Sequence, residues 1–366
     1  MTSEEISSIR LQNQQIAATE FRKVQDLVYW MGAMQAQDFG MVKWAIGARL
    51  TSMTDATVTE AFERGEIIRT HLLRPTWHLV SSADIYWILE LTAPHIKSLL
   101  RSRHRDLELS ESTINKSKSV VEKLLVGGKH LTREEILHQF RNAGISTEGQ
   151  RAYHLMLICE LDGIVCSGMP NGKNQTYTLL EEWVPKTSSF NREAALAELA
   201  KRYFTSHGPA TIQDFIWWSG LPVKDAKNAL ELIKSGFVSE KIDEQIYWHS
   251  GSYQASAYKK GEAYLLPAYD EFIISYRDRS ASLPADVHKK TISENGLFRP
   301  TLVINGKVCG IWKRRQMKDK VLIEMDYFQP VIPKTKNEIE AASKRYGQFL
   351  SQKTEMANHL ESGRAG

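Results

Sequence analysis

The sequence has little of what several classes of protein depend on. Its 366 residues include only three cysteines, Cys159, Cys166 and Cys309, which are too few and too scattered for a disulfide framework or a zinc site with paired ligands. No stretch approaches the ~20 apolar residues of a membrane span, and the N-terminus lacks the basic and apolar regions of a signal peptide. We therefore expect reduced cysteines and a cytoplasmic protein without a membrane partner.

Motifs for cofactors are also absent from the sequence. The segment GMPNGKN (168–174) has one residue too few between its glycines for a phosphate-binding loop, and no Ser or Thr follows Lys173. Neither G-x-S-x-G nor HExxH occurs. No metal or organic cofactor is implied. The net charge of +4 is compatible with nucleic acid but decides nothing by itself.

What the chain does contain is a unit that occurs three times. In 131–179, Thr132 and Glu135 form a capping box, two amphipathic helices follow, and Asp162-Gly163 turns into a hairpin. The same order returns in 208–248 and occurs earlier in 40–79. Helix, turn, helix and hairpin is the order of a winged helix-turn-helix, so three such motifs in tandem are predicted.

Glycines mark the end of the second helix in each predicted copy. Gly65, Gly163 and Gly236 stand where that helix gives way to an apolar strand, as a glycine after a helix C-terminus would. The predicted first helix of the chain, before these copies, runs roughly from Ala18 to Met34.

From about residue 262 the pattern changes to short strands. The segments 262–280 and 295–328 are predicted to form them, with Asn305-Gly306 as a hairpin turn and a final helix from Asn337. The predicted fold is α+β, with three winged helices followed by a small, barrel-like β-rich domain and a terminal helix. The predicted domains are 1–110, 111–190, 191–260 and 261–366.

Two glutamines stand one residue apart in MQAQDF (34–39), between two predicted helices. If the backbone is extended there, Gln35 and Gln37 point to the same side. They either bond to free backbone groups at the helix ends or hold a water or substrate edge, since an amide is both donor and acceptor. Asp38 is a natural N-cap for the next helix.

Five segments together resemble the bacterial winged-helix family of the DNA glycosylases AlkZ and YcaQ. They are MQAQDFG (34–40), RTHLLRPTWHLVSSAD (69–84), ATIQDFIWWSGL (210–221), LLPAYDEFIISYRDRS (265–280) and NGLFRPTLVINGKVCGIWKR (295–314). The resemblance extends from about residue 8 to 350. It implies three winged helices and a β-rich domain wrapped around duplex DNA.

The family's catalytic element is Gln, an apolar residue, then Gln or Asp, and Gln35-Ala36-Gln37 matches the Gln-x-Gln branch. The resemblance therefore implies a monofunctional DNA glycosylase that hydrolyses the N-glycosidic bond of N7-alkylguanine, unhooks interstrand crosslinks and uses Gln35 and Gln37 to position water. Its partner would be duplex DNA containing alkylated or crosslinked guanine. We expect a monomer, nucleoid-associated when it is bound to DNA.

Further DNA contacts are predicted on a wing and on a basic cluster. Strand alternation places Arg69 and His71 on one face of the wing and Arg74, Thr76 and His78 on another. Lys313, Arg314 and Arg315 would contact phosphates.

Two other functions stay open at this point. One is a tandem winged-helix transcription factor or architectural DNA binder without catalysis, which buried glutamines bonded to the backbone would favour. The other is a protein-binding role for the winged helices.

Overall fold

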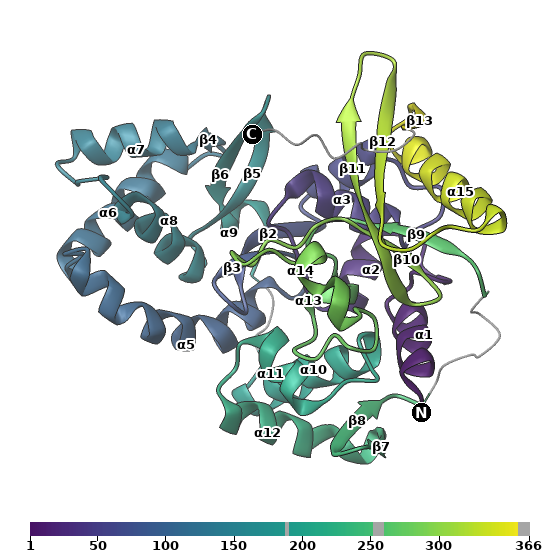
Figure 1. Cartoon of the computed structure of the whole chain (residues 1–366). Helices are drawn as coiled ribbons and strands as arrows, with labels where there is room; N and C mark the ends of the chain where they lie inside the picture. The colour runs from purple at the N-terminus through teal and green to yellow at the C-terminus, as the bar shows by residue number, and fades with distance from the viewer. Residues whose placement is uncertain (187–189, 252–259, 358–366) are drawn as a thin grey trace.

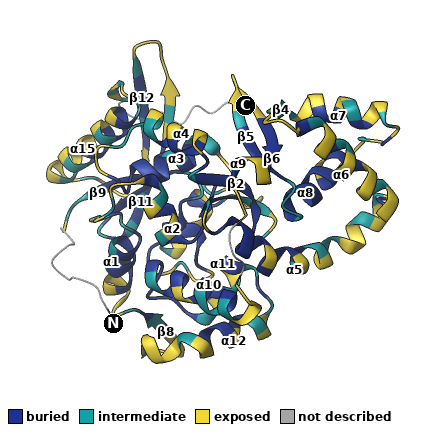
Figure 2. Cartoon of the chain, turned by 180° about the vertical axis from the view of Figure 1, so that it is seen from behind, coloured by how far each residue is buried: buried dark blue, intermediate teal, exposed yellow. Residues whose placement is uncertain are grey.

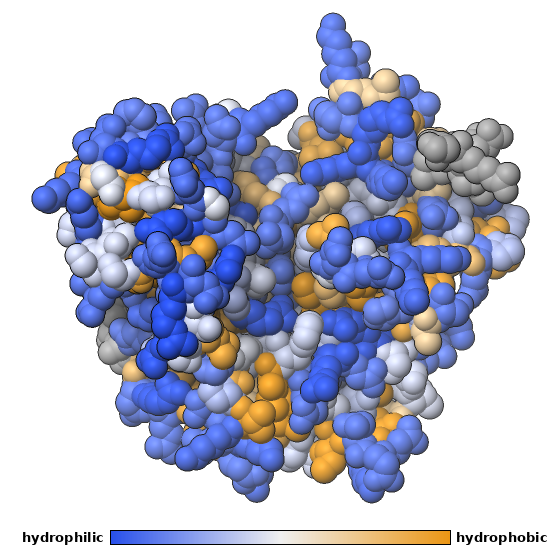
Figure 3. All heavy atoms as spheres, turned by 60° about the vertical axis from the view of Figure 1, so that its left-hand side comes forward, coloured by the Kyte–Doolittle hydropathy of each residue, from blue (hydrophilic) through white to orange (hydrophobic). Residues whose placement is uncertain are grey.

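The computed structural model describes residues 1–186, 190–251 and 260–357 of the chain. Over these residues the fold is mixed α and β, with four sheets (Figure 1). None of the described helices is both long and apolar enough to cross a membrane. On the face drawn in Figure 3, most residues are hydrophilic, and hydrophobic residues form small groups between them.

The first predicted unit consists of two helices and a hairpin. These are α3 (Phe39–Gly47), α4 (Asp55–Glu63), β2 (Ile67–Leu72) and β3 (Thr76–Ser81). Asp38 caps α3 by accepting a hydrogen bond from the Met41 N–H at 3.0 Å, as predicted. The short strand β1 (Met34–Gln35) pairs with β3, which makes the sheet order β1-β3-β2.

The same arrangement recurs at the two other predicted places. The second unit contains β4 (Leu131–Thr132), α7 (Arg133–Asn142), α8 (Arg151–Leu161), β5 (Val165–Asn171) and β6 (Asn174–Leu179). The third contains α11 (Ile212–Ser219), α12 (Val223–Ile233), β7 (Val238–Ile242) and β8 (Gln245–His249). A short extended stretch before the first helix pairs with the second hairpin strand each time. In the third unit this stretch is the single bridge from Ala210 to Trp248.

Two of the three predicted helix-ending glycines have the expected conformation. Gly65 and Gly163 both have φ +67°, a left-handed conformation that favours glycine. The prediction is wrong at Gly236, which lies in a 3₁₀ turn (η1, Lys234–Gly236) without a positive φ. This turn ends α12 without a left-handed residue.

Helices outside the units join them and cover their sheets. They are α1 (Ser3–Asn13), α2 (Val24–Met31), α5 (Ile85–Asp106), α6 (Glu111–Leu125), α9 (Leu180–Trp183), α10 (Arg192–Ser206), α13 (Glu271–Ile274), α14 (His288–Thr291) and α15 (Pro333–Phe349). Figure 2 shows β2 buried near the centre, whereas α5, α6 and α7 expose much of their outer surface. The predicted helix 18–34 is shorter than expected, because Gly32 has φ +74° and Met34 already pairs with β3.

The C-terminal segment forms a five-stranded sheet in the order β13-β12-β11-β10-β9. Its strands are β9 (Ala263–Leu266), β10 (Thr301–Ile304), β11 (Lys307–Gln316), β12 (Lys320–Tyr327) and β13 (Lys353–Ala357). The two outer strands both contact α15, so the sheet curls around this helix. The strand expected beyond residue 270 is wrong, because Asp270 caps the short helix α13 instead.

One hydrophobic core joins the first unit to the C-terminal sheet. The ring of Tyr346 in α15 lies 4.9 Å from that of Trp44 in α3 and 5.1 Å from that of Trp312 in β11. Trp44 also donates a hydrogen bond from Nε1 to the Leu265 carbonyl at 2.7 Å. The core thus crosses between the predicted domains 1–110 and 261–366. The domain boundaries stay predictions, and residues 252–259 and 358–366 lie outside the described chain.

Candidate active site

Gln35 is held in a short strand at the centre of the molecule. Its partner across β1 and β3 is His78, and the next pair across the sheet joins His78 to Thr70. Side chains of directly opposite residues lie on the same face of a sheet, so these three residues form a row. The Ala36 N–H extends the pairing by donating to the Trp77 carbonyl at 2.7 Å. The backbone is therefore extended at Gln35 and Ala36 but bends at Gln37, so a common side for the two glutamine side chains stays a prediction.

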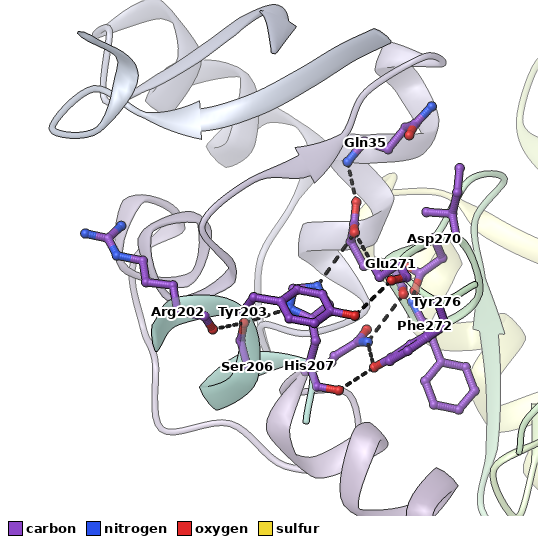
Figure 4. A network of polar contacts seen from close by, with 12 residues as sticks. Gln35, Arg202, Tyr203, Ser206, His207, Asp270, Glu271, Phe272 and Tyr276 are labelled. Carbon is purple, nitrogen blue, oxygen red and sulfur yellow. Dashed lines mark hydrogen bonds and ion pairs between the residues drawn. The ribbon is translucent and has the colours of Figure 1, made fainter. Parts of the chain in front are cut away.

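Two charged residues hold Gln35 from opposite sides. Its backbone N–H donates to Oε1 of Glu271 at 2.5 Å, and its side-chain Oε1 accepts from Nη2 of Arg74 at 2.9 Å. A guanidinium can only donate, so the amide atom facing Arg74 is the oxygen. The Nε2 amide has no hydrogen-bond partner within the described ranges. Figure 4 shows the side chain pointing away from Glu271.

Glu271 is buried and ionised. Burial opposes its charge, but His207, Ser275 and the Gln35 N–H favour the charge and lower the pKa of Glu271 to about 2. The Ser275 hydroxyl donates a hydrogen bond to Oε2, and His207 Nε2 lies 3.7 Å from the same oxygen. Glu271 is thus a fixed acceptor for the backbone of Gln35, supplied by a segment 236 positions later in the chain.

Gln37 has different surroundings from Gln35. It is exposed and lines a cavity of about 730 Å³ between the first unit and the β5–β6 hairpin of the second. The two carboxylates of this cavity have structural partners, since Asp38 caps α3 and Asp55 accepts from Lys43 Nζ at 2.7 Å. Neither glutamine side chain bonds to a helix end in the described structure. The alternative that both cap helices is therefore not what the geometry favours.

The comparisons with known proteins cover all the segments that form this site. A family model described as "DNA glycosylase AlkZ-like" matches residues 28–349. The chain belongs to the AlkZ-like DNA glycosylase family. The predicted resemblance is confirmed, and membership supports a DNA glycosylase whose partner is DNA. Comparison with curated proteins gives no sequence match.

A solved structure supports the same fold. The chain is similar to the Streptomyces sahachiroi DNA glycosylase AlkZ with a TM-score of 0.80 at 16% identity, covering 98% of this chain and 100% of the other. At this identity the likeness concerns the fold. The α+β architecture with its curled C-terminal sheet is the part of the fold prediction that the likeness supports.

In this AlkZ-like chain, Arg69 and His71 of the predicted wing are buried. Arg69 donates from Nε to the Ala36 carbonyl at 3.0 Å and from Nη1 to Ser167 Oγ at 3.3 Å. Burial lowers the pKa of Arg69 to about 10. His71 contacts Glu160 of α8, with 2.7 Å between Nδ1 and Oε2. Both side chains thus join the first unit to the second, and their predicted DNA contacts stay predictions.

The other three wing residues differ in exposure. Arg74 and Thr76 are half-buried, whereas His78 has 0% exposure. His78 Nδ1 lies 2.9 Å from the Thr76 carbonyl, so Nδ1 carries the proton and Nε2 is an acceptor without a partner in the described chain. In this arrangement His78 supports the row that contains Gln35 and does not reach the surface.

The burial of His78 predicts acid-sensitive stability. Burial, with the charge of Arg74, lowers the pKa of His78 from 6.5 to about 4. The unfolded chain therefore binds more protons between these values, and the free energy of unfolding falls as the pH falls through this window. We expect this residue to contribute a loss of about 3 kcal/mol between pH 7 and pH 4. Urea denaturation should show that loss in the wild type and a smaller one in His78→Asn; equal losses would contradict the assignment.

The basic residues of β11 lie on the hairpin that projects beyond the rest of the molecule (Figure 1). Lys313 is exposed, and Arg315 pairs with Glu324 at 2.7 Å. Arg314 donates from Nη1 to the Tyr346 hydroxyl at 2.5 Å and lies close to Gly40 at the start of α3. Arg314 is thus the member of the group nearest the QAQ element, and all three DNA contacts stay predictions.

Two residues beside Arg74 were not predicted to belong to the site, although the sequence favours a structural ion network for one of them, Arg279. Trp217 and Arg279 lie beside Arg74, and both occur in segments that carried the family resemblance, 210–221 and 265–280. The resemblance was therefore the only signal that could have found them. No group of three or more His, Cys, Asp or Glu side chains in the described part of the chain could hold a metal ion.

Proposed function

We propose that this chain excises N7-alkylguanine from duplex DNA and unhooks interstrand crosslinks, using a water held between Gln35 and Gln37. The observation that supports this most is the bond from Arg74 to Gln35 Oε1. That bond fixes the amide so that its Nε2 donor remains available on the element that also presents Gln37. The proposal adds a substrate class and a pair of catalytic residues to the glycosylase activity of the family.

The chemistry of the leaving group explains why amides suffice. Alkylation at N7 leaves the purine cationic, so the bond from N9 to C1′ breaks readily toward an oxocarbenium-like sugar. The difficulty is then to position a water rather than to deprotonate it. The described carboxylates near the two glutamines all have partners, which supports this substrate: Asp38 caps α3, Asp55 accepts from Lys43, and Glu271 faces a backbone N–H.

The two glutamines have complementary roles in this proposal. Nε2 of Gln35 donates a hydrogen bond to the water oxygen, and the water donates one hydrogen bond to Oε1 of Gln37. A remaining lone pair then faces C1′, and the carbonyl dipole of Gln37 stabilises the positive charge that develops there. One oriented group of this kind is worth roughly 3 kcal/mol, or about two orders of magnitude in rate.

The exposure of Gln37 favours crosslinks as substrates. A base tied to both strands cannot swing fully out of the duplex, so the enzyme has to reach the sugar without complete base flipping. An exposed amide at a junction between elements suits that approach better than a deep pocket would. The three helix–helix–hairpin units, taken as winged helices, would hold the duplex, and Lys313 would contact a phosphate.

Monofunctional action is part of the proposal. A glycosylase that also cleaves the strand uses an amine nucleophile. Two lysines line the Gln37 cavity: Lys43 is paired with Asp55 and also donates to Thr59 Oγ1 at 3.1 Å, and Lys173 is exposed on the turn between β5 and β6. The product expected under this proposal is an abasic site in an uncut strand.

The test uses the wild-type chain with three duplexes, which contain one N7-methylguanine, one nitrogen-mustard crosslink or one uracil. We expect free methylguanine, separated strands from the crosslink after unhooking, and no release of uracil. The strands should stay intact until the abasic site is cleaved with alkali. Tight binding without product from the first two duplexes would instead favour a non-catalytic winged-helix DNA binder.

A further inference from the structure

A pair of guanidinium groups lies on one tryptophan beside Gln35. Trp217 of α11 is 40% exposed, and the Cζ atoms of Arg74 and Arg279 lie 5.3 Å and 5.2 Å from its ring centroid. Nε1 of Trp217 donates to the Ile274 carbonyl at 2.8 Å, which fixes the indole against α13. The tryptophan thus holds two cations from different parts of the chain at one place.

Neither guanidinium forms an ion pair within the described ranges. Glu271 attracts Arg74, and Asp214 and Asp278 attract Arg279, from beyond ion-pair distance. Arg74 bonds only to the Trp217 carbonyl at 3.1 Å and to Gln35. Arg279 bonds to the carbonyls of Ile273 at 2.9 Å and Arg277 at 3.4 Å. Each guanidinium has five N–H donors, so both retain donors for another acceptor.

The two charges are close enough to affect each other. Burial, together with the charge of Arg74, lowers the pKa of Arg279 to about 10, although Asp214 and Asp278 oppose this shift. Two half-buried cations without an anion are unfavourable, and an anion bound between them would remove the repulsion. Guanidinium forks match the oxygens of a phosphate, and the phosphodiester is the anion that duplex DNA supplies.

We propose that Arg74, Arg279 and Trp217 form a phosphate clamp for the phosphodiester next to the lesion. The clamp rests on the proposed function, since it takes its ligand from the DNA on which Gln35 acts. A phosphate bound there restrains the Arg74 guanidinium, whose Nη2 orients Gln35. Arg279 is therefore a binding residue for the substrate backbone, and Arg74 is both a binding and a positioning residue.

The clamp predicts different kinetic effects for its two arginines. Arg279→Gln should weaken duplex binding by about tenfold and leave the single-turnover rate at saturating enzyme within about threefold, because Gln35 keeps its partner. Arg74→Gln should weaken binding and also lower that rate by about tenfold or more. Arg277→Gln is the matched control, since Arg277 is exposed in the same loop and contacts Gln213 at 3.3 Å instead of Trp217.

A scan with uncharged linkages tests the clamp directly. Duplexes carry one methylphosphonate at each position around an N7-methylguanine, and the Kd is measured by fluorescence anisotropy for the wild type, Arg279→Gln and Arg277→Gln. At one position, the methylphosphonate should weaken duplex binding by the wild type about tenfold. The same substitution should not weaken binding further in Arg279→Gln, but it should still weaken binding in Arg277→Gln. If the methylphosphonate at every position weakens binding by Arg279→Gln as much as it weakens binding by the wild type, the clamp is overturned.

Two further readouts separate the clamp from folding and from the proposed function. Arg279→Lys keeps the charge but not the fork, so it should give a smaller loss of binding than Arg279→Gln at the same Tm as the wild type; equal binding by the two variants would argue against the clamp. The binding scan does not depend on excision. If one methylphosphonate position is coupled to Arg279 in binding but the wild type releases no base, the result supports the clamp and contradicts the proposed function.

Discussion

Replacing Gln37 with alanine should slow single-turnover excision of N7-methylguanine by about 100-fold, with duplex binding within about threefold of the wild type. Gln37 is exposed and has no protein partner in the described structure, so the change removes the water's acceptor without disturbing packing. The same loss is expected for Gln35→Ala, which also leaves Arg74 without its side-chain acceptor.

A charged isostere separates the roles of the two atoms of the Gln35 amide. Gln35→Glu keeps an oxygen for Arg74 but removes the Nε2 donor, so excision should fall nearly as far as in Gln35→Ala. Wild-type activity in Gln35→Glu would show that the donor is not needed. Gln25→Ala is the control, because Gln25 is a half-buried glutamine of α2 that bonds only to Ser82 Oγ at 3.3 Å.

The second large effect concerns stability and should follow the loss of Arg49. This residue donates to Asp270 through both Nη atoms, at 2.8 Å and 2.9 Å, and both side chains are almost fully buried. Arg49→Met leaves the Asp270 carboxylate buried without its partner and should lower the free energy of unfolding by about 3–5 kcal/mol. Urea denaturation measures this change.

Two companion variants make that result interpretable. Arg64→Met removes an exposed ion pair with Glu66 at 2.8 Å and should cost less than about 1 kcal/mol. Adding Asp270→Asn to Arg49→Met should recover part of the lost stability. A loss in Arg49→Met no larger than in Arg64→Met would contradict the importance of the buried pair.

The Arg49 pair also connects stability with the candidate site. Asp270 caps α13 by accepting from the Phe272 N–H at 2.9 Å, and α13 begins with Glu271, the acceptor for the Gln35 backbone. Arg49→Met should therefore also reduce excision at temperatures where the variant remains folded.

Local features of the fold were predictable because their causes lie within a few residues. The capping box of Thr132 and Glu135 and the N-cap at Asp38 are both present. Asn305 and Gly306 have the positive φ values, 51° and 72°, of the predicted hairpin turn. Gly236 failed because a helix can also end through a 3₁₀ turn, and the local sequence does not distinguish the two endings.

Partners that are distant in sequence were not predictable in the same way. Strand alternation correctly places His71 and His78 on opposite faces of the hairpin. It does not show that Glu160 contacts His71 or that His78 has no exposed surface. Gln35 likewise depends on Glu271, whose place beside it is created by the core shared by the first unit and the C-terminal sheet. The family resemblance located the QAQ element, whereas only the folded chain identifies its supports.

The most direct test of the account is single-turnover release of N7-methylguanine by the wild type, by each alanine variant at Gln35 and Gln37, and by the double variant. If the glutamines hold one water as a unit, the wild type releases the base, each single change costs about 100-fold, and the double change costs little more than either alone. Wild-type rates in the single variants, or a bound duplex from which the wild type releases no base, would contradict it.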